Sequence, residues 1–439
     1  MKAGFSGILQ LTDLNDFIAP SQECIKPILV EKSTSAIKQP SKIKVETDGT
    51  YVEIDQRGTK NPLKQAQITL NDCLACSGCV TSAETILIQQ QSSQEFLNAL
   101  NKKKENSDLK IVLSVSPQSL ASLAAKYCLN LEELTEKLQN FLYGLGVDYI
   151  LDTSIGWICY AEKTYGDVII PHLSQVRSPQ AIMGALVKNY MAKKFDFLPE
   201  NIYHSTIMPC FDKKLEASRD DFLLPGTSLR EVDCVLSTAE LDEILTSYNF
   251  SDYKSNNKSS NDFLKFRDQN GRILSHSGGG SGGYLENVFR YAVKEVFGVN
   301  VAENEPIPLS FSKNKDFREA TLTLDGKCVL KMAYCYGFRN LQNIVQKLRR
   351  GKCSFDYVEA MACPGGCLNG GGQIRSTNFD DVCEKYESST KMWPDNCEIT
   401  NKIARDWFEC EYENEKAVQL LYTDYHVIEK AVLPLAIKW

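Results

Sequence analysis

Short apolar runs alternate with helix-like stretches between residues 108 and 250. Runs of this length, rich in β-branched residues, are typical of buried strands. The four runs are Leu109–Val115, Val147–Leu151, Ile202–Met208 and Asp233–Ser237. Ser116-Pro117 and Ser178-Pro179 each place a capping serine before a proline at the first helical position, and Leu131–Leu145 is a further predicted helix. Strands that alternate with helices predict a parallel sheet covered on both faces.

A second α/β unit is predicted beyond a polar linker that begins at Ser251–Asp262. Its predicted elements are a helix from Tyr284, a hairpin over Ala320–Tyr336 that turns at Asp325-Gly326, a helix from about Asn340 to Arg350, and a strand over Phe355–Val358. Two α/β lobes would enclose a cleft, and ligands of such sheets lie off the carboxyl ends of the strands. Cys210 and Cys363 both follow predicted strands, so we expect them at the same edge.

The composition and net charge of the chain exclude some classes of protein. The chain has 439 residues, of which 43% are hydrophobic and 24% charged, and its net charge is −7. The negative charge argues against a general nucleic-acid binder. The absence of an apolar run of about 18 residues predicts that the chain has no membrane-spanning helix. The N-terminal residues have the pattern of neither a signal peptide nor a transit peptide. The expected compartment is the cytosol, where sixteen cysteines indicate metal binding rather than disulfides.

The N-terminal region contains a closely spaced cysteine motif. Cys73, Cys76 and Cys79 form a C-x2-C-x2-C run, a spacing that lets three thiolates reach adjacent irons of one cluster. Cys24 is the natural candidate for a fourth ligand. Zinc usually takes two separated C-x2-C knuckles, so an iron–sulfur cluster is the favoured hypothesis, with zinc and unligated cysteines as alternatives. A small hairpin over Val45–Ile54, turning at Asp48-Gly49, is also predicted in this region.

A second set of cysteines lies in the two predicted lobes. Cys363 and Cys367 sit in the stretch EAMACPGGCLNGGGQ, Glu359–Gln373, and Cys210 follows a predicted strand. Soft thiolates favour a soft metal, and glycine lets bare backbone approach a bound cluster. The alternative is that these are buried structural cysteines. The remaining cysteines are interpreted mostly as packing thiols, namely Cys128, Cys234, Cys328, Cys335, Cys353, Cys383, Cys397 and Cys410.

The glycine run Gly278–Gly283 precedes a predicted helix and formally matches G-x-G-x-x-G. A dinucleotide site would also need an acidic ribose contact and a clear βαβ setting, neither of which is evident. The favoured interpretation is a loop whose backbone packs close to the second cysteine site.

Several motifs together resemble one known family. Met208–Lys213 (MPCFDK) resembles the MPCxxK motif of iron-only hydrogenases, and Glu359–Gln373 resembles their last cysteine motif. Gly156–Thr164 (GWICYAEKT), the form GGGSGGYLE of the glycine run and the terminal Trp439 are closer to the eukaryotic hydrogenase-like branch, the NARF-like cytosolic iron–sulfur assembly factors. The resemblance covers nearly the whole chain.

The resemblance implies an α/β, iron-only-hydrogenase-like fold, with two lobes of parallel sheets around a central cluster cleft and a small N-terminal cluster-binding region. The implied segments are an N-terminal iron–sulfur cluster region (1–105), a first α/β lobe (106–250), a polar linker (251–276), a second α/β lobe (277–380), and a helical C-terminal segment with a tail (381–439).

The resemblance also implies two 4Fe–4S clusters. The first would be held by Cys24, Cys73, Cys76 and Cys79, and the second by Cys210, Cys363, Cys367 and a further cysteine. The family carries that further cysteine just before the GW of GWICYAEK, where this chain reads Ser154-Ile155. The stretch between Asp148 and Trp157 is also shorter than in the family, which suggests a missing segment. Cys159 is a possible stand-in, although it is not a ligand in the family.

The function implied is that of a non-enzymatic carrier or adaptor in cytosolic iron–sulfur cluster assembly. Its implied partners are P-loop scaffold proteins and a cytosolic targeting complex with a WD-repeat subunit, with neither nucleic acid nor membrane as a partner. The family docks on the targeting complex through a tail similar to Ile437–Trp439, although Trp439 could instead pack on its own domain. The nucleus is a second candidate compartment. The alternatives are a true hydrogenase-type oxidoreductase and an interaction protein without clusters.

Overall fold

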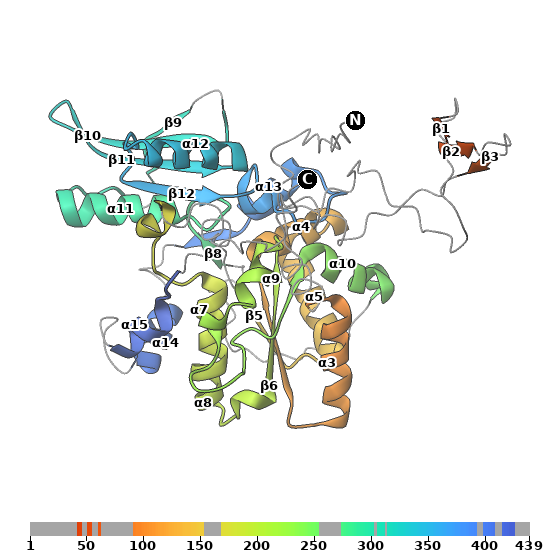
Figure 1. The fold of residues 1–439 in the computed structure, drawn as a ribbon. Helices are drawn as coiled ribbons and strands as arrows, with labels where there is room; N and C mark the ends of the chain where they lie inside the picture. Colours follow the sequence, from red (N-terminus) through yellow and green to blue (C-terminus); the bar gives the residue numbers. More distant parts are fainter. Residues whose placement is uncertain are drawn as a thin grey trace, which may run out of the picture. The chain divides into compact units, whose positions relative to one another are not determined.

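The computed structural model describes the chain in ten ranges: 42–45, 51–54, 60–62, 91–152, 168–253, 274–302, 305–311, 314–392, 398–408 and 415–425 (Figure 1). The chain divides into two compact units, Met1–Ile86 and Leu87–Trp439. None of the helices in the described ranges is long and apolar enough to cross a membrane.

The first unit contains a small antiparallel sheet of order β1-β2-β3. Its strands are β1 (Lys42–Val45), β2 (Tyr51–Ile54) and β3 (Lys60–Pro62). Lys42 pairs with Ile54 and Val45 with Tyr51, which confirms the predicted hairpin. Its turn, Asp48-Gly49, lies outside the described residues.

The second unit begins with a parallel sheet of order β5-β4-β6-β7. The strands are β4 (Lys110–Val115), β5 (Tyr149–Asp152), β6 (Ile202–Met208) and β7 (Cys234–Ser237). All four match strands predicted from apolar runs. The chain passes from β4 to β5 on one side, and β6 pairs on the other side of β4. The order therefore reverses at the β4–β6 pair, the point at which open α/β sheets bind ligands.

Helices cover both faces of this sheet, as predicted. One face packs against α3 (Ser93–Glu105), α4 (Pro117–Tyr127), α5 (Leu131–Leu145) and α10 (Thr238–Ser247). Because strand side chains alternate between faces, Ile111 and Leu113 of β4 join this core while Val112 joins the core on the other face. The Ser116 side chain caps α4 with Pro117 at its first position, as the Ser-Pro pair predicts.

The opposite face is covered by a continuous helical segment and by the C-terminal helices. α7 (Pro179–Ala185) continues through a π-helical stretch, η2 (Leu186–Met191), into α8 (Ala192–Lys194). α14 (Glu398–Phe408) and α15 (Glu415–Leu421) return to this face and bury Trp407 and Ala417 there. Short 3-10 turns are η1 (Ile170–His172), η3 (Pro199–Asn201), η4 (Asp220–Phe222) and η5 (Phe250–Asp252).

The second lobe contains a sheet of order β12-β11-β10-β9. Its strands are β9 (Leu309–Phe311), β10 (Phe317–Leu324), β11 (Lys327–Tyr336) and β12 (Tyr357–Met361). β10 and β11 form the predicted hairpin, and β11 pairs with β12 in parallel. The expectation of a parallel sheet in this lobe is therefore wrong, because a tight hairpin makes its two strands antiparallel. The α/β class itself is confirmed.

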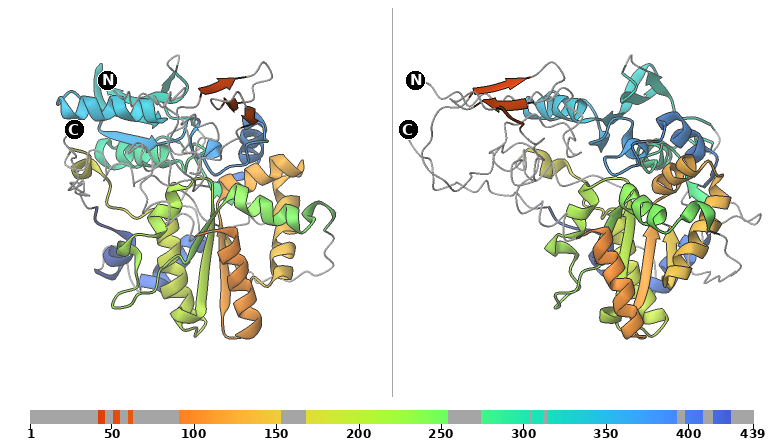
Figure 2. Two further views of the ribbon diagram at one scale, coloured as in Figure 1. Left: turned by 45° about the vertical axis from the view of Figure 1, so that its right-hand side comes forward. Right: turned by 90° about the vertical axis from the view of Figure 1, so that its right-hand side faces the viewer.

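Two helices pack on this sheet, and further contacts join it to the first lobe. α11 (Tyr284–Phe297) buries Leu285 and Phe289 in a core that also contains Met208 of β6, and α12 (Phe338–Arg349) contacts β11 and β12. α13 (Phe379–Glu387) packs on α4, which both views of Figure 2 show as a blue helix beside an orange one. A small parallel sheet pairs β8 (Leu274–His276) with β13 (Thr390–Met392). The boundaries predicted for the five segments of the chain, from the N-terminal cluster region to the C-terminal tail, remain a prediction.

Candidate metal centre

The second set of cysteines lies at the carboxyl ends of strands from both lobes. β6 ends at Met208, and Cys210 follows just before α9 (Asp212–Ala217). β12 ends at Met361, two residues before Cys363, and Cys367 lies in the 3-10 turn η6 (Gly366–Asn369). Because β6 flanks the reversal point of the first sheet, these cysteines lie where the fold is expected to bind a ligand.

The two cysteine loops touch through their backbones. The Gly372 amide donates to the Pro209 carbonyl oxygen at 2.7 Å. A Cβ added at Gly370 would lie 2.2 Å from that same oxygen, and one at Gly372 would lie 2.9 Å from Ser237 Cβ. Atoms do not approach so closely without displacement, so the glycines are required for this contact.

The glycine run Gly278–Gly283 packs on the same loop. The Cys367 amide donates to Ser281 Oγ at 3.0 Å, and a Cβ added at Gly280 would lie 2.4 Å from Leu368 Cδ1. Gln118, in the first turn of α4, donates through Nε2 to the Gly280 carbonyl at 2.9 Å. The run therefore supports the second cysteine site, in line with the interpretation favoured over a dinucleotide site.

The three thiols are close enough to influence one another. Burial raises the pKa of the Cys210 thiol, and Asp212, Cys363 and Cys367 raise it further. Burial also raises the pKa of Cys363, and together with Cys363 it raises the pKa of Cys367 to about 12. Thiols with such pKa values stay protonated at neutral pH unless a metal binds and displaces their protons.

The separation between thiolate ligands differs between a single metal ion and an iron–sulfur cluster. Among the described residues, no group of three or more His, Cys, Asp or Glu side chains is close enough to hold one metal ion. Thiolates on one zinc lie within about 4 Å of each other, because each Zn–S bond is about 2.3 Å long. A cluster that gives each thiolate its own iron spaces them more widely. Three thiols under bare glycine backbone form a donor set of the kind that an iron–sulfur cluster takes.

A buried ion pair lies beside the thiols. The Lys213 side chain is fully buried, and its Nζ lies 2.5 Å from Glu216 Oε2. Burial alone would lower the pKa of Lys213, but Glu216 and Asp212 raise it above its ordinary value. Ser178 Oγ donates to the other carboxylate oxygen of Glu216 at 2.5 Å. A fixed positive charge thus lies next to the sulfur ligands, where it would stabilise an anionic cluster.

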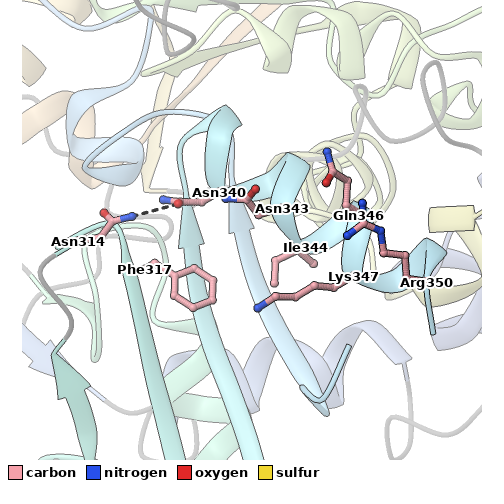
Figure 3. Close-up of a pocket in the computed structure, with 8 residues that line it drawn as sticks. All are labelled: Asn314, Phe317, Asn340, Asn343, Ile344, Gln346, Lys347 and Arg350. Carbon is pink, nitrogen blue, oxygen red and sulfur yellow. Dashed lines mark hydrogen bonds between the residues drawn. The ribbon is translucent and has the colours of Figure 1, made fainter. Parts of the chain in front are cut away.

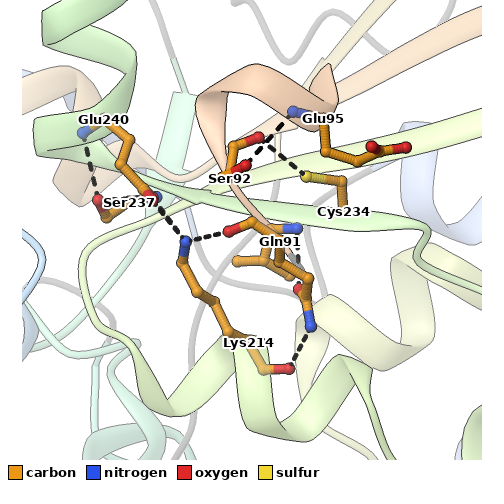
Figure 4. Close-up of polar contacts among 8 residues, drawn as sticks. Gln91, Ser92, Glu95, Lys214, Cys234, Ser237 and Glu240 are labelled. Atoms are coloured by element: carbon orange, nitrogen blue, oxygen red, sulfur yellow. Dashed lines mark hydrogen bonds and ion pairs between the residues drawn. The ribbon is translucent and has the colours of Figure 1, made fainter. Parts of the chain in front are cut away.

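The start of the second unit is anchored to the helix that follows Cys210. Gln91 Nε2 donates to the Lys214 carbonyl at 2.7 Å, and the buried Lys214 Nζ donates to the Gln91 carbonyl at 2.5 Å (Figure 4). Lys214 also pairs with Glu240 at 2.7 Å, and Gln91 Oε1 accepts from the Val235 amide. α9 therefore has Lys213 at the cysteine site and Lys214 at the point where the chain enters the second unit.

A separate pocket of about 390 Å³ lies between α12 and the loop before β10 (Figure 3). It is lined by Asn314, Phe317, Asn340, Asn343, Ile344, Gln346, Lys347 and Arg350. Asp316, in the same loop, accepts from the Gly365 amide at 2.7 Å. None of the residues that line the pocket is a predicted site residue. The loop before β10, which lines one side of the pocket, is hydrogen-bonded through Asp316 to the loop that contains Cys363 and Cys367.

The other predicted site residues lie outside the described residues. They are Cys24, Cys73, Cys76, Cys79, Cys159 and Trp439. Cys128 and Cys328 are exposed, so these two are exceptions to the interpretation of the remaining cysteines as packing thiols. Cys128 is the residue that ends α4, with a positive φ of 53°, and Cys328 lies beside the hairpin turn. Cys234 and Cys335 are buried, as predicted.

Sequence reasoning missed Lys213, Ser281 and Glu359 as parts of the site. Glu359 is 2% exposed and lies in the strand that leads to Cys363. A carboxylate in an otherwise apolar strand costs free energy unless it is hydrogen-bonded. That position alone could have marked Glu359 as a functional candidate.

Comparison with known proteins bears on this site directly. A family model for the iron only hydrogenase large subunit, C-terminal domain, matches residues 154–371, a range that includes Cys210, Cys363 and Cys367. The chain is 46% identical to the cytosolic Fe-S cluster assembly factor narfl of Xenopus tropicalis, and 44% identical to the cytosolic iron-sulfur assembly component 3 of Pongo abelii. Both alignments cover 100% of each chain. This chain belongs to the family of cytosolic iron–sulfur cluster assembly factors.

These alignments are longer than the protein itself. Each is 483 positions long, whereas the protein has 439 residues, so 44 alignment positions have no residue of this protein. The hydrogenase family match begins at residue 154, just after β5 ends at Asp152. The location of the gap before Trp157 stays a prediction.

Solved structures agree on the fold. An FeFe-hydrogenase studied for its inactivation by oxygen has a TM-score of 0.62 and 23% identity, over 76% of this protein and 99% of that chain. An apo FeFe-hydrogenase from Chlamydomonas reinhardtii has the same TM-score and coverage, with 22% identity. At this identity the likeness establishes a hydrogenase-like fold and nothing about activity.

Proposed function

We propose that this protein is an iron–sulfur carrier or adaptor of the cytosolic cluster assembly machinery. One structural observation carries the proposal: Cys210, Cys363 and Cys367 converge beneath glycine backbone at the carboxyl ends of strands from two lobes. The names of the relatives, which are cytosolic iron–sulfur assembly factors, give the process. In this proposal the protein acts in the cytosol, with the nucleus as a second compartment.

The protein would hold two 4Fe–4S clusters. Cys24, Cys73, Cys76 and Cys79 would hold the first, and Cys210, Cys363 and Cys367 would supply three ligands to the second. A bound cluster supplies one-electron chemistry and iron–sulfide units that can be passed on. The residues of the protein position the three sulfurs, screen their charge with Lys213 and keep bulky side chains away through Gly370 and Gly372.

We propose that the protein has no hydrogenase activity of its own. In sequence it lacks a counterpart of the cysteine that relays protons to the active iron pair in hydrogenases. A hydrogen-uptake assay on protein reconstituted with iron, sulfide and a di-iron cofactor tests this point. No turnover is expected, and measurable turnover would favour the alternative, a hydrogenase-type oxidoreductase.

The proposed partners are P-loop scaffold proteins, which hand clusters on, and a targeting complex with a WD-repeat subunit, which receives them. The tail that ends at Trp439 is the proposed docking element for the targeting complex. Removing Ile437–Trp439 should abolish binding of that complex in a pull-down and leave the cluster spectrum unchanged. Retained binding would rule out the docking role.

The cluster content tests the proposed function itself. Anaerobically purified protein should be brown, absorb broadly near about 400 nm and contain iron and acid-labile sulfide in about equal amounts. Cys363→Ser should remove about half of that absorbance, and Cys73→Ser should remove the other half. Cys328→Ser is the matched control, because Cys328 is exposed and lies away from the site. A full spectrum in both site variants would contradict the proposal.

A further inference from the structure

A continuous set of hydrogen bonds leads from a proposed cluster ligand to a buried carboxyl group. The Cys367 amide donates to Ser281 Oγ at 3.0 Å. The Ser281 side chain is hydrogen-bonded to the Tyr336 hydroxyl, which donates to Glu359 Oε1 at 2.6 Å. The path crosses three segments that are distant in sequence: the glycine run, β11 and β12.

Glu359 is held in place from two sides. Its other oxygen, Oε2, accepts from the Leu285 amide in the first turn of α11 at 2.8 Å. Each carboxyl oxygen therefore accepts one hydrogen bond, and only 2% of the residue is exposed. A purely structural role, capping α11, would also account for this bond, so the proposal depends on the charges around the group.

Titratable and charged side chains from every neighbouring element face Glu359. They are Glu286 from α11, Arg318 from β10, Tyr334 and Tyr336 from β11, Tyr357 from β12, and Cys367. Burial raises the pKa of Glu359 to about 7, and Glu286 also raises it, while bonds from Tyr336 and Leu285 and the charge of Arg318 lower it. A small change in nearby charge can therefore change its protonation at neutral pH.

We propose that Glu359 takes up one proton from solvent when the second cluster gains one electron. This inference rests on the proposed function, since it requires a cluster on Cys210, Cys363 and Cys367. The electron comes from a one-electron donor, such as a reduced flavoprotein. The reduced cluster gains one negative charge and the Glu359 carboxylate becomes a neutral carboxylic acid, so the total charge of the buried site is unchanged.

Two further polar groups lie close to the glycine run. Glu286 is half-buried, and both its Oε2 atom and the Tyr334 hydroxyl are buried without a hydrogen-bond partner among the described residues. A Cβ added at Gly279 would lie 3.6 Å from Glu286 Oε1 and 3.5 Å from the Tyr334 hydroxyl, so both groups lie directly beneath the glycine run.

Charge balance is the physical reason for the coupling. Adding an electron to a poorly solvated site is unfavourable, because the surroundings cannot reorient to screen the charge. Uptake of a proton at a nearby carboxylate removes that cost. The Ser281–Tyr336 path holds Glu359 at a fixed position relative to the ligand Cys367.

The test is the pH dependence of the midpoint potential of the second cluster. The Cys73→Ser background removes the first cluster, and EPR-monitored titrations with dithionite follow the second between pH 6 and 9. The midpoint potential should fall with rising pH by up to about 59 mV per unit, the value for one proton per electron. Glu359→Gln should make it independent of pH, and Tyr336→Phe should reduce the slope.

Glu319→Gln is the matched control, since Glu319 lies on β10 of the same sheet, part-exposed and paired with Lys331 at 2.9 Å. Its slope should equal that of the parent protein. A flat potential in parent protein that contains the cluster would overturn the coupling and leave the proposed function intact. An unchanged slope in Glu359→Gln would do the same, whereas parent protein without a second cluster would overturn both.

Discussion

Gly372 and Pro209 are joined by a 2.7 Å hydrogen bond from the Gly372 amide to the Pro209 carbonyl oxygen. The two residues are far apart in sequence and come from different lobes. Their contact brings the loop with Cys363 and Cys367 against the loop with Cys210, and it depends on glycine at positions 370 and 372.

Gly370→Ala should open this contact. The added Cβ would lie 2.2 Å from the Pro209 oxygen, so one of the loops must move. We expect a loss of about 1–3 kcal/mol in the free energy of unfolding, measured by urea denaturation, and weaker cluster retention, measured as absorbance after gel filtration. Gly279→Ala is the control, because its Cβ would meet neighbours no closer than 3.5 Å. Equal behaviour of the two variants would refute the close-packing argument.

Lys213→Met should destabilise the protein because it leaves the Glu216 carboxylate buried without its cation. Loss of one partner of a buried pair costs about 3–5 kcal/mol. The double variant with Glu216→Gln should recover much of that loss, since glutamine can still bond Ser178 and Gln180. Urea denaturation of the metal-free single and double variants provides the measurement. A double variant no more stable than Lys213→Met would contradict the pairing.

The buried His204 should make the free energy of unfolding decrease as the pH falls below about 6.5. Burial lowers the pKa of His204 to about 3, and its ring is bonded to Ser114 and to the Glu231 carbonyl. The unfolded chain therefore binds a proton below about pH 6.5 that the folded protein does not bind. The free energy of unfolding should fall as pH drops from 6.5 to 5, by about 2 kcal/mol from this residue.

The measurement is the difference between pH 6.5 and pH 5 in urea denaturation of parent protein and of His204→Gln. The variant is expected to be less stable at pH 6.5 but to lose less stability on acidification. His172→Gln, at an exposed position, should behave like the parent protein. Identical acid sensitivity in all three proteins would show that His204 makes no such contribution.

The sequence by itself determined the local structure of this protein. Apolar runs marked β4, β5, β6 and β7, and Ser-Pro pairs marked the starts of α4 and α7, because strand burial and helix capping depend on residues close in the chain. The spacing of Cys363 and Cys367 among glycines likewise indicated a metal-holding loop.

Only the tertiary structure decided which residues meet across the lobes. It set the mixed pairing of the second sheet, brought Pro209 against Gly370, placed Lys213 beside the thiols and joined Glu359 to Tyr336 from the neighbouring strand. It also left Cys128 and Cys328 exposed. The physical reason is that burial, charge and hydrogen-bond partners at a site come from segments distant in sequence, and a local pattern contains no information about which segment will pack there.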